Sequence, residues 1–597
     1  MDTIAIVDFG GQYTHLIANR VRRLRVYSEI IPPEQDPSSL KGLKGVILSG
    51  GPASVYEPDA PRLNPAVLEC GVPILGLCYG HQLLAQMLGG TVEPGAVREY
   101  GIATLTVHRA VGPLAGLGPT EEVWMSHGDT VSVMPPGFER LGSTKDCENA
   151  AVGDPNRKIY GLQFHPEVTH TRNGIKMIDN FLSVCGCDRQ WTMEGFIEAS
   201  VQSIREQVGD RNVFLLVSGG IDSTVAFALL NRALGEDRVL GLHIDNGFMR
   251  KGETASVMKT MAKLGFQNCR VVDASERFLN AVKGVTDPQE KREIIGRVFI
   301  DVCNAELERL NLDPDHWMLG QGTLYPDVIE SGGTRHAAVI KTHHNRVDVV
   351  EELIARGMVV EPLAQLYKDE VREIAKQLGI PDEVIWRHPF PGPGLSVRCL
   401  CSTGEDSQIP RETQDTAADV ASRFGLRAVV LPIRSVGVQG DYRTYAHPAA
   451  LEGETDWRTL EAASTAITNE VRGVNRVVYT LLPEQTPSLR PKEAYLTRER
   501  LDLLREADAV AMEELSKLGL METVFQMPTI LLPLTTDGTN ECVVIRPLES
   551  QDVMTARFAE LPLDAAKQMA RRIVEVGPIA AVFYDVTHKP PATMEWE

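Results

Sequence analysis

The sequence predicts an α/β protein of several domains, and three observations lead to this prediction. The chain has 597 residues, of which 43% are hydrophobic and 23% charged. This length exceeds what one hydrophobic core usually organises, and the composition is that of a globular protein and not of a disordered one. Short apolar runs alternate with helical patterns near the N-terminus and again from residue 213, and several of them end at glycine-bearing turns, as buried parallel strands do.

Charge and cysteine content exclude several classes of protein. Lys and Arg number 60 against 80 Asp and Glu, so the formal charge is −20, which disfavours a dedicated nucleic-acid-binding protein. No apolar run reaches the roughly 18 residues that a membrane span needs, and no basic leader precedes the first apolar run. Ten scattered cysteines argue against a disulfide framework. We therefore expect a reduced cytoplasmic protein without a membrane or nucleic-acid partner.

The first domain is predicted to span residues 1–188. Its expected parallel strands are Ile4–Val7, Gly45–Leu48 and Pro73–Leu77. The pattern breaks near Cys185-Gly186-Cys187. These two cysteines could bind a metal, but one residue separates them and no second pair is near, which favours free thiols.

A cysteine at a sharp strand-to-helix turn is the candidate nucleophile. Cys78 stands in Gly76-Leu77-Cys78-Tyr79-Gly80, where small neighbours permit the turn that projects its side chain, and the following helix N-terminus favours the thiolate. His165-Pro166-Glu167 supplies the partners, because residues i and i+2 of an extended segment point to the same side. Glu167 can then orient His165 while the imidazole takes the Cys78 proton. An inert core cysteine and an ordinary turn histidine are the alternatives.

The first domain resembles the class I glutamine amidotransferases. Four motifs carry the resemblance: Leu48-Ser49-Gly50-Gly51-Pro52, Gly76-Leu77-Cys78-Tyr79-Gly80-His81-Gln82, Trp124-Met125-Ser126-His127-Gly128-Asp129 and His165-Pro166-Glu167. The resemblance implies that Cys78 attacks the side-chain amide of glutamine, releases ammonia and leaves a thioester for water to hydrolyse. It also implies that the backbone N–H groups of Gly51 and Tyr79 hold the oxyanion, and that Gln82 helps to seat the glutamine.

A glycine-rich loop opens the second predicted domain, residues 192–398. The loop is Ser218-Gly219-Gly220-Ile221-Asp222-Ser223, between an expected strand at Val213–Val217 and a helix. Backbone N–H groups of Gly219 and Gly220, with the hydroxyls of Ser218 and Ser223, can cradle phosphate oxygens at the helix N-terminus. Asp222 is then placed to bind Mg²⁺, the metal expected to accompany ATP. No Gly-Lys-Ser/Thr occurs, so this is not a Walker loop, and a plain strand–helix turn is the alternative.

The hexapeptide resembles the pyrophosphate loop of the ATP pyrophosphatases, whose domain is similar to the adenine-nucleotide α-hydrolases. This resemblance implies cleavage of ATP between its α and β phosphates and adenylation of a substrate oxygen, with no redox cofactor. Asp245-Asn246-Gly247 follows the next expected strand, Val239–Ile244, and we expect it to border the nucleotide. Residues 321–345 have little periodicity and are expected to form a mobile lid.

Further segments resemble the GMP synthetase family of glutamine-dependent ligases, and they extend to the end of the chain. They are Gly320–Ser331, Lys341–Asn345, His388–Leu395 and Lys589–Glu597. The resemblance implies that XMP is the acceptor, with Lys589 neutralising its phosphate and Glu595 accepting hydrogen bonds from the xanthine N–H groups. The other positions implied to contact XMP are Arg292, Asp441, Arg443 and Gln526. Surface cations are the alternative for Arg292 and Arg443.

The last predicted domain, residues 399–597, is expected to be a duplicated α+β unit. Two weakly similar stretches each begin with an apolar run closed by Leu-Pro and later present a strand-like segment, which divides the domain into copies at about 404–510 and 511–597. Chance similarity of two strands is the alternative. The resemblance implies a dimerisation-type domain, so the protein could be a homodimer. It could also be a monomer, if the two copies within one chain pair with each other.

Together the resemblances imply a cytoplasmic ligase that makes GMP, AMP, diphosphate and glutamate from XMP, ATP, glutamine and water. The alternative is a glutamine-dependent pyrophosphate-loop synthetase acting on another acceptor. NAD synthetase would carry a nitrilase-like glutaminase without the His165–Glu167 pair. A tRNA-modifying enzyme would need a basic face, and a nucleotide-sensing module would leave the complete set of triad residues unexplained.

Overall fold

The chain divides into two compact units, Met1–Phe196 and Ile197–Glu597. The computed structural model describes residues 1–597 except 12, 313–314, 331–352, 354–355, 406–407, 440–441 and 551–555. Within the described part, no helix is long and apolar enough to cross a membrane. Each unit is described by itself.

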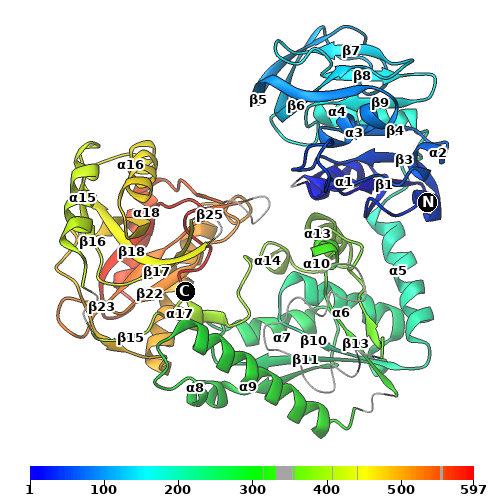
Figure 1. Ribbon diagram of the computed structural model, residues 1–597. Helices are drawn as coiled ribbons and strands as arrows, with labels where there is room; N and C mark the ends of the chain where they lie inside the picture. The colour runs from blue at the N-terminus through cyan, green and yellow to red at the C-terminus, as the bar shows by residue number, and fades with distance from the viewer. Residues whose placement is uncertain are drawn as a thin grey trace. The chain divides into compact units, whose positions relative to one another are not determined.

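A nine-stranded sheet forms the centre of the first unit (Figure 1). Its order is β2-β1-β3-β4-β9-β8-β7-β5-β6, parallel from β2 to β9 and antiparallel from β9 to β6. The strands are β1 (Thr3–Val7), β2 (Tyr27–Ile31), β3 (Leu43–Leu48), β4 (Ile74–Leu77), β5 (Thr91–Val107), β6 (Thr120–Val133), β7 (Glu139–Ser143), β8 (Ala151–Asp154) and β9 (Ile159–Leu162).

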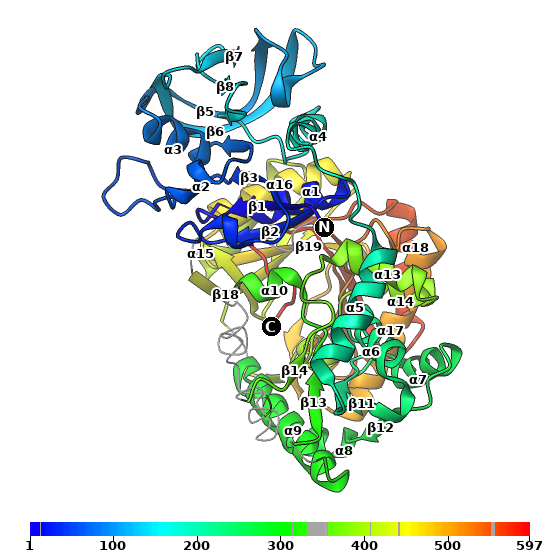
Figure 2. The same cartoon turned by 90° about the vertical axis from the view of Figure 1, so that its right-hand side faces the viewer.

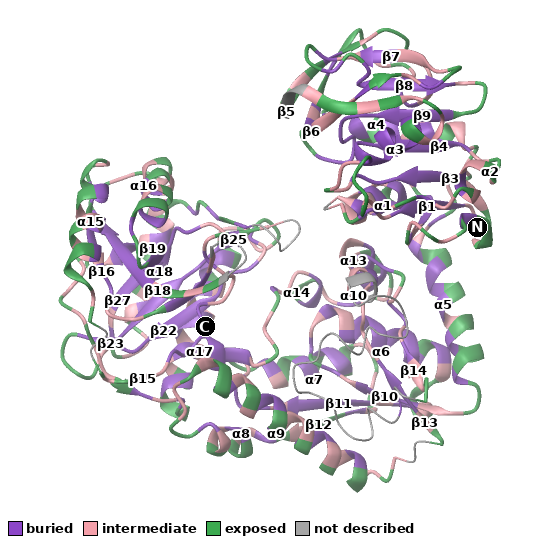
Figure 3. Cartoon of the chain, viewed as in Figure 1, coloured by how far each residue is buried: buried purple, intermediate pink, exposed green. Residues whose placement is uncertain are grey.

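The helices of the first unit are α1 (Thr14–Arg23), α2 (Ala66–Glu69), α3 (Tyr79–Met87) and α4 (Gly174–Val184), with short 3₁₀ turns η1 (Pro37–Ser39) and η2 (Gly112–Leu114). The strands predicted from apolar runs are confirmed as β1, β3 and β4. Every residue of β1 and β4 is buried, as Figure 3 shows, which explains why these strands read as continuous apolar runs. The carboxyl ends of β4 and β9 lead into the segments that carry the candidate triad, and that of β3 leads into Gly50 and Gly51.

The second unit contains an all-parallel sheet of five strands, in the order β12-β11-β10-β13-β14. The strands are β10 (Asn212–Leu216), β11 (Val239–Asp245), β12 (Cys269–Asp273), β13 (Trp317–Gly320) and β14 (Val359–Val360). The two strands predicted around residues 213 and 239 are thus confirmed. The pyrophosphate-type loop and the Asp245 turn follow the neighbouring strands β10 and β11, where α/β sheets bind their ligands.

Helices connect and flank these parallel strands (Figure 2). They are α5 (Met193–Val208), α6 (Ile221–Leu234), η3 (Glu236–Arg238), α7 (Glu253–Lys263), α8 (Ser275–Ala281), α9 (Pro288–Arg309), α10 (Tyr325–Glu330), α13 (Lys368–Gln377), α14 (Asp382–Ile385) and η4 (Gly394–Val397). The start of α9 shows why its sequence forms a helix there. Asp287 accepts a hydrogen bond from the Glu290 N–H, and Pro288 occupies the first turn, where no N–H is required.

A second, mixed sheet follows, in the order β16-β18-β19-β27-β24-β22, with β17 paired to β18. Its strands are β16 (Arg427–Val430), β17 (Ser435–Gln439), β18 (Tyr442–Glu452), β19 (Val474–Leu482), β22 (Thr529–Leu532), β24 (Glu541–Ile545) and β27 (Ile579–Asp585). Its helices are α15 (Arg411–Ser422), α16 (Trp457–Glu470), α17 (Arg498–Lys517) and α18 (Leu563–Val574). Short pairs join β15 (Ser402–Thr403) to β21 (Glu493–Ala494), β20 (Arg490–Pro491) to β23 (Leu534–Thr535) and β25 (Leu548–Glu549) to β26 (Arg557–Phe558).

The two halves of this mixed sheet repeat one order of elements. Each half has a helix, an antiparallel strand pair, a second helix and a strand parallel to its neighbour, and the last strands of the halves, β19 and β27, pair antiparallel at the centre. One core, containing Ala463 of α16 and Met569 of α18, packs the helices onto the sheet. A separate core contains Phe583 and Trp596, so the C-terminal tail contributes to it.

Candidate functional site

Cys78 occupies the predicted turn between β4 and α3. Its φ is +50°, which a non-glycine residue rarely adopts, and 7% of the residue is exposed. The neighbouring positions must be glycine because there is no space for a side chain at either of them. A Cβ on Gly76 would lie 2.5 Å from the Gly80 carbonyl oxygen, and one on Gly80 would lie 2.6 Å from the Leu48 carbonyl oxygen. The backbone strain at Cys78 is therefore held by close packing of the strand and helix around it.

His165 and Glu167 form a buried pair. Nδ1 of His165 lies 2.7 Å from Oε1 of Glu167, and the two residues are 5% and 1% exposed. Burial alone would lower the pKa of His165, but the Glu167 charge and the contacts with Cys78 and Glu167 outweigh it and raise that pKa to about 10. Gly50 adjoins both groups, since a Cβ there would lie 3.2 Å from His165 Cε1 and 3.7 Å from Cys78 Cβ. The structure thus brings the three predicted triad residues together.

The residues predicted to bind glutamine and its oxyanion surround the same cysteine. A Cβ on Gly51 would lie 3.4 Å from Tyr79 Cγ, so Gly51 packs against the side chain of the residue that follows Cys78. Gln82 is 3% exposed, and its side-chain nitrogen donates to the Asp129 carbonyl oxygen at 3.0 Å and to Gln163 Oε1 at 3.1 Å. Both N–H bonds of Gln82 are therefore committed, and a substrate could meet only its oxygen.

The pyrophosphate-type loop precedes α6. Gly219 has φ +81°, the Ser218 and Ser223 hydroxyls are 3.1 Å apart, and Gly220 donates its N–H to Ser218 Oγ at 3.3 Å. Asp222 lies in the first turn of α6. The loop therefore requires glycine at position 219, because other residues rarely adopt a positive φ.

Asp222 has the features of a cation ligand. Its Oδ2 pairs with Lys368 Nζ at 2.5 Å, whereas its Oδ1 is buried without a hydrogen-bond partner in the described part of the chain. A buried, unpartnered carboxylate oxygen at a phosphate-binding loop fits Mg²⁺, which prefers carboxylate and phosphate oxygens. The described residues contain no cluster of three or more His, Cys, Asp or Glu side chains for a metal.

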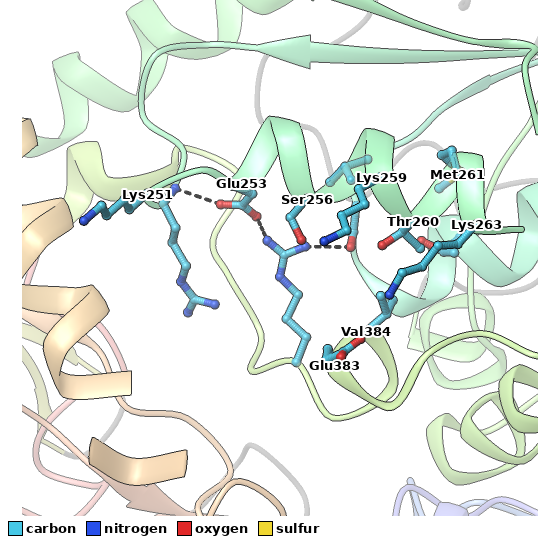
Figure 4. A pocket seen from close by; sticks show the side chains of 14 residues that line it. Lys251, Glu253, Ser256, Lys259, Thr260, Met261, Lys263, Glu383 and Val384 are labelled. Carbon is cyan, nitrogen blue, oxygen red and sulfur yellow. Dashed lines mark hydrogen bonds and ion pairs between the residues drawn. The ribbon is translucent and has the colours of Figure 1, made fainter. Parts of the chain in front are cut away.

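A cavity of about 370 Å³ adjoins this loop. Arg387 donates to the Gly219 carbonyl oxygen at 2.9 Å and pairs with Glu253. Figure 4 shows Lys259 and Lys263 of α7 facing α14 across this space. The charged lining residues are Arg250, Lys251, Glu253, Lys259, Lys263, Glu383 and Arg387. The excess of cations over carboxylates suits an anion such as a polyphosphate chain.

The C-terminal tail brings together several of the predicted XMP contacts. Glu595 receives two hydrogen bonds from the fully buried Arg398, at 2.7 and 3.0 Å, and one from Gln526 Nε2 at 3.4 Å. Gln526 also donates to the Pro389 carbonyl oxygen at 3.1 Å. The proline-rich loop (His388–Leu395) and the C-terminal tail (Lys589–Glu597) therefore meet at Gln526, as a purine pocket between them would require.

The other predicted XMP contacts are placed differently. Arg292 donates to the backbone oxygen of Glu597, and the neighbouring Lys291 pairs with the Glu597 carboxylate at 2.5 Å. Lys589 exchanges backbone hydrogen bonds with Ala556. Arg443 is exposed on β18. Asp441 and most of the predicted lid, from residue 331 onward, lie outside the described residues.

Comparison with known proteins places this arrangement in a family. Residues 5–185 match the family model "Glutamine amidotransferase class-I", residues 193–293 match "NAD synthase", and residues 412–488 and 513–596 match "GMP synthase C terminal domain". A protein of Leptospira interrogans named "Probable GMP synthase [glutamine-hydrolyzing]" is 44% identical over 100% of this chain and 99% of its own length. The chain belongs to the glutamine-hydrolysing GMP synthase family.

Members of the GMP synthase family differ in how much of this chain they match. The GMP synthase of Streptomyces coelicolor is 40% identical over 100% of this chain and 98% of its own length. That of Heliobacterium modesticaldum is 47% identical, and the match covers 97% of its length but 80% of this chain. This chain therefore carries additional sequence relative to the Heliobacterium protein.

Three residues at these candidate sites were not anticipated from the sequence. They are Gln163 beside Cys78, Lys368 on Asp222 and Arg398 on Glu595. Only Gln163 had a usable signal, since it lies two residues before His165 and a residue at i−2 of an extended segment points to the same side. The other two come from segments more than a hundred residues from their partners.

Proposed function

We propose that this chain is a GMP synthase that converts XMP, ATP, glutamine and water into GMP, AMP, diphosphate and glutamate. The observation that carries the proposal is that the Cys78–His165–Glu167 arrangement and the pyrophosphate-type loop stand in one chain that matches family members along its whole length. One site would release ammonia, and the other would activate the oxygen that ammonia replaces.

The proposed glutaminase step begins at Cys78. His165 takes the thiol proton and, because its pKa is raised, keeps it, so that Cys78 attacks as a thiolate. The sulfur attacks the side-chain carbonyl carbon of glutamine, and the N–H groups of Gly51 and Tyr79 stabilise the oxyanion. His165 then gives its proton to the leaving ammonia, and water hydrolyses the glutamyl thioester. Glu167 supports this cycle because its carboxylate, 2.7 Å from Nδ1, stabilises the protonated imidazole.

The proposed ATP site is the loop Ser218–Ser223, with the basic cavity beside Gly219 available to the departing diphosphate. Asp222 would hold Mg²⁺, which when bound neutralises phosphate charge. Lys368 already pairs with Asp222, so its ammonium is in place to contact the same phosphate oxygens. The xanthine oxygen of XMP attacks the α-phosphorus of ATP and diphosphate leaves. Ammonia then attacks the activated carbon and AMP leaves.

The proposed XMP site uses the tail and the proline-rich loop. Arg398 holds the Glu595 carboxylate by two hydrogen bonds, which presets it to accept from the xanthine N–H groups. Gln526 lies within reach of Glu595 and of the loop at Pro389. We keep Lys589, Arg292, Arg443 and Asp441 as proposed contacts on the family resemblance.

We further propose the division into domains at 1–188, 192–398 and 399–597, the last with copies at about 404–510 and 511–597. The repeated order of helices and strands in the last sheet supports two copies, but its second half begins with α17 (Arg498–Lys517), which the proposed boundary at 510 would divide. Because the two copies already pair through β19 and β27, a monomer is compatible with this arrangement, and a homodimer remains the alternative. All ten cysteines are free, in agreement with a cytoplasmic enzyme.

Replacing the nucleophile tests whether ammonia release and GMP formation take place at separate sites. We expect Cys78→Ala to lose GMP formation with glutamine and to keep it with ammonium, because only the first nitrogen source needs the thiol. Cys70→Ala, a half-buried cysteine of the same unit, is the matched control and should keep both activities. Equal loss of both activities in Cys78→Ala, in a variant that still folds, would show the proposal to be wrong.

A further inference from the structure

The buried side chain of Gln163 contacts the sulfur of Cys78. Gln163 directly follows β9 and has no exposed surface. Its Nε2 lies 3.7 Å from Cys78 Sγ, and its backbone N–H donates to the Ala150 carbonyl oxygen at 2.8 Å. Gln163 and His165 occupy alternate positions of one segment, so both side chains approach the cysteine from the same side.

The orientation of the Gln163 amide follows from the groups around it. Gln82 Nε2 donates to the Asp129 carbonyl oxygen, which can only accept, so this end of the Gln82 amide must be the nitrogen. Its second N–H then points to Gln163 Oε1 at 3.1 Å. With its oxygen bound in this way, Gln163 turns its own N–H toward Cys78.

A second contact of Cys78 has the opposite character. The thiol donates to the Ser126 carbonyl oxygen at 3.5 Å. A carbonyl oxygen stabilises a thiol but repels a thiolate, whereas an amide N–H stabilises the thiolate. When His165 removes the proton, the Ser126 contact becomes unfavourable and the Gln163 contact becomes a charge-assisted hydrogen bond.

We propose that Gln163 is a catalytic residue of the glutaminase site, donating a hydrogen bond to the attacking sulfur of Cys78, and that Gln82 is a positioning residue that sets its amide. The proposal rests on Cys78 being the nucleophile of the proposed function. No proton leaves Gln163. The Cys78 proton goes to His165, the C–S bond forms, and the C–N bond breaks as ammonia takes the proton from His165.

The test replaces Gln163 by a side chain of similar length without an N–H. The rate at which iodoacetamide alkylates Cys78 is measured at several pH values by mass spectrometry of the Cys78 peptide. The midpoint, which is the pH at which this rate is half of its maximum, should be higher in Gln163→Met than in wild type. Glutamine-dependent GMP formation should fall roughly 10–100-fold, the value of a hydrogen bond to a charged group. Ammonium-dependent GMP formation should not change.

Two further variants keep the result interpretable. Gln82→Met frees the Gln163 amide to turn, so a smaller upward displacement of the same midpoint is expected. Gln86→Met, at an exposed position of the same helix, should leave the midpoint unchanged. If Gln163→Met does not fold, the midpoint of Gln82→Met decides the question.

An unchanged alkylation midpoint in folded Gln163→Met, or in Gln82→Met where that variant decides, overturns the role of Gln163 alone. Glutamine-dependent synthesis by Cys78→Ala would instead overturn the proposed function on which it rests. The two failures are distinguishable because alkylation of Cys78 is measured without any substrate.

Discussion

Arg476 Nη1 lies 2.7 Å from Asp585 Oδ2, and neither side chain has exposed surface. Arg476 belongs to β19 in the first half of the C-terminal sheet and Asp585 to β27 in the second. The same guanidinium stacks over the ring of Trp596 at 4.8 Å and donates to the Glu595 carbonyl oxygen at 3.3 Å. One buried cation thus joins the two halves and also holds the tail that carries Glu595.

The tail is further attached to the first half by its backbone. Val436 donates to the Trp596 carbonyl oxygen at 2.9 Å, and Val438 donates to that of Pro591 at 2.7 Å. Both donors lie on β17, which is a strand of the first half. The tail therefore follows β27 of the second half and binds to β17 of the first half. The proposed XMP site accordingly needs both halves.

Removing Arg476 should destabilise the second unit strongly. In Arg476→Met, Asp585 loses one of its two arginine partners in a fully buried position, and we expect a loss of roughly 3–5 kcal/mol in the free energy of unfolding. Chemical denaturation would measure this loss. Arg423→Met breaks the exposed pair with Glu470 and should cost at most about 1 kcal/mol. Equal small costs for both variants would contradict the structural role of Arg476.

Replacing Glu167 should change the protonation of His165. Burial lowers the pKa of His165, but the Glu167 charge and the contacts with Cys78 and Glu167 raise it to about 10 against its ordinary 6.5. In Glu167→Gln burial is less opposed, so that pKa should fall. NMR of labelled histidines, assigned with a His165→Asn variant, would measure it. Loss of the imidazolium should also lower glutamine-dependent GMP formation and spare the ammonium-dependent reaction.

The same pair predicts how stability depends on pH. Because the folded-state pKa is raised, the stabilisation by protonated His165 is complete below pH 6.5 and is lost as the pH rises toward about 10. The difference in unfolding free energy between wild type and Glu167→Gln should therefore shrink over this interval. A difference that grows with pH would show that the pair does not hold a protonated imidazole.

Replacing Asp222 should affect the ATP-dependent step regardless of the nitrogen source. Asp222→Asn removes the carboxylate proposed to bind Mg²⁺, and we expect AMP formation to fall by at least roughly 10–100-fold with glutamine and with ammonium. Asp237→Asn, at an exposed position after the same helix, is the control. Full ammonium-dependent activity in Asp222→Asn would remove Asp222 from the ATP site. This profile differs from that of Cys78→Ala, which should lose one nitrogen source only.

Local patterns explain why much of the site could be predicted from the sequence. A strand, a turn of small residues and a helix lie within a few residues of each other at Cys78 and at the loop around Asp222. The residues that permit φ of +50° at Cys78 and of +81° at Gly219 are close together in the sequence, although packing from Leu48 also holds the turn at Cys78. The predicted pairing of Glu167 with His165 is present, but the structure forms it across a turn at Pro166 and Glu167 and not along an extended segment.

The amino-acid sequence by itself determined the α/β class, the strands and turns that carry the nucleophile and the phosphate loop, and the family motifs. Only the tertiary structure decided that Gln163 meets Cys78, that Lys368 meets Asp222 and that Arg476 meets Asp585, pairs separated by 85, 146 and 109 residues. Such contacts depend on the order and register of strands in a sheet. The order and register depend on which faces of the sheets are buried, and the pattern of a single segment does not predict them.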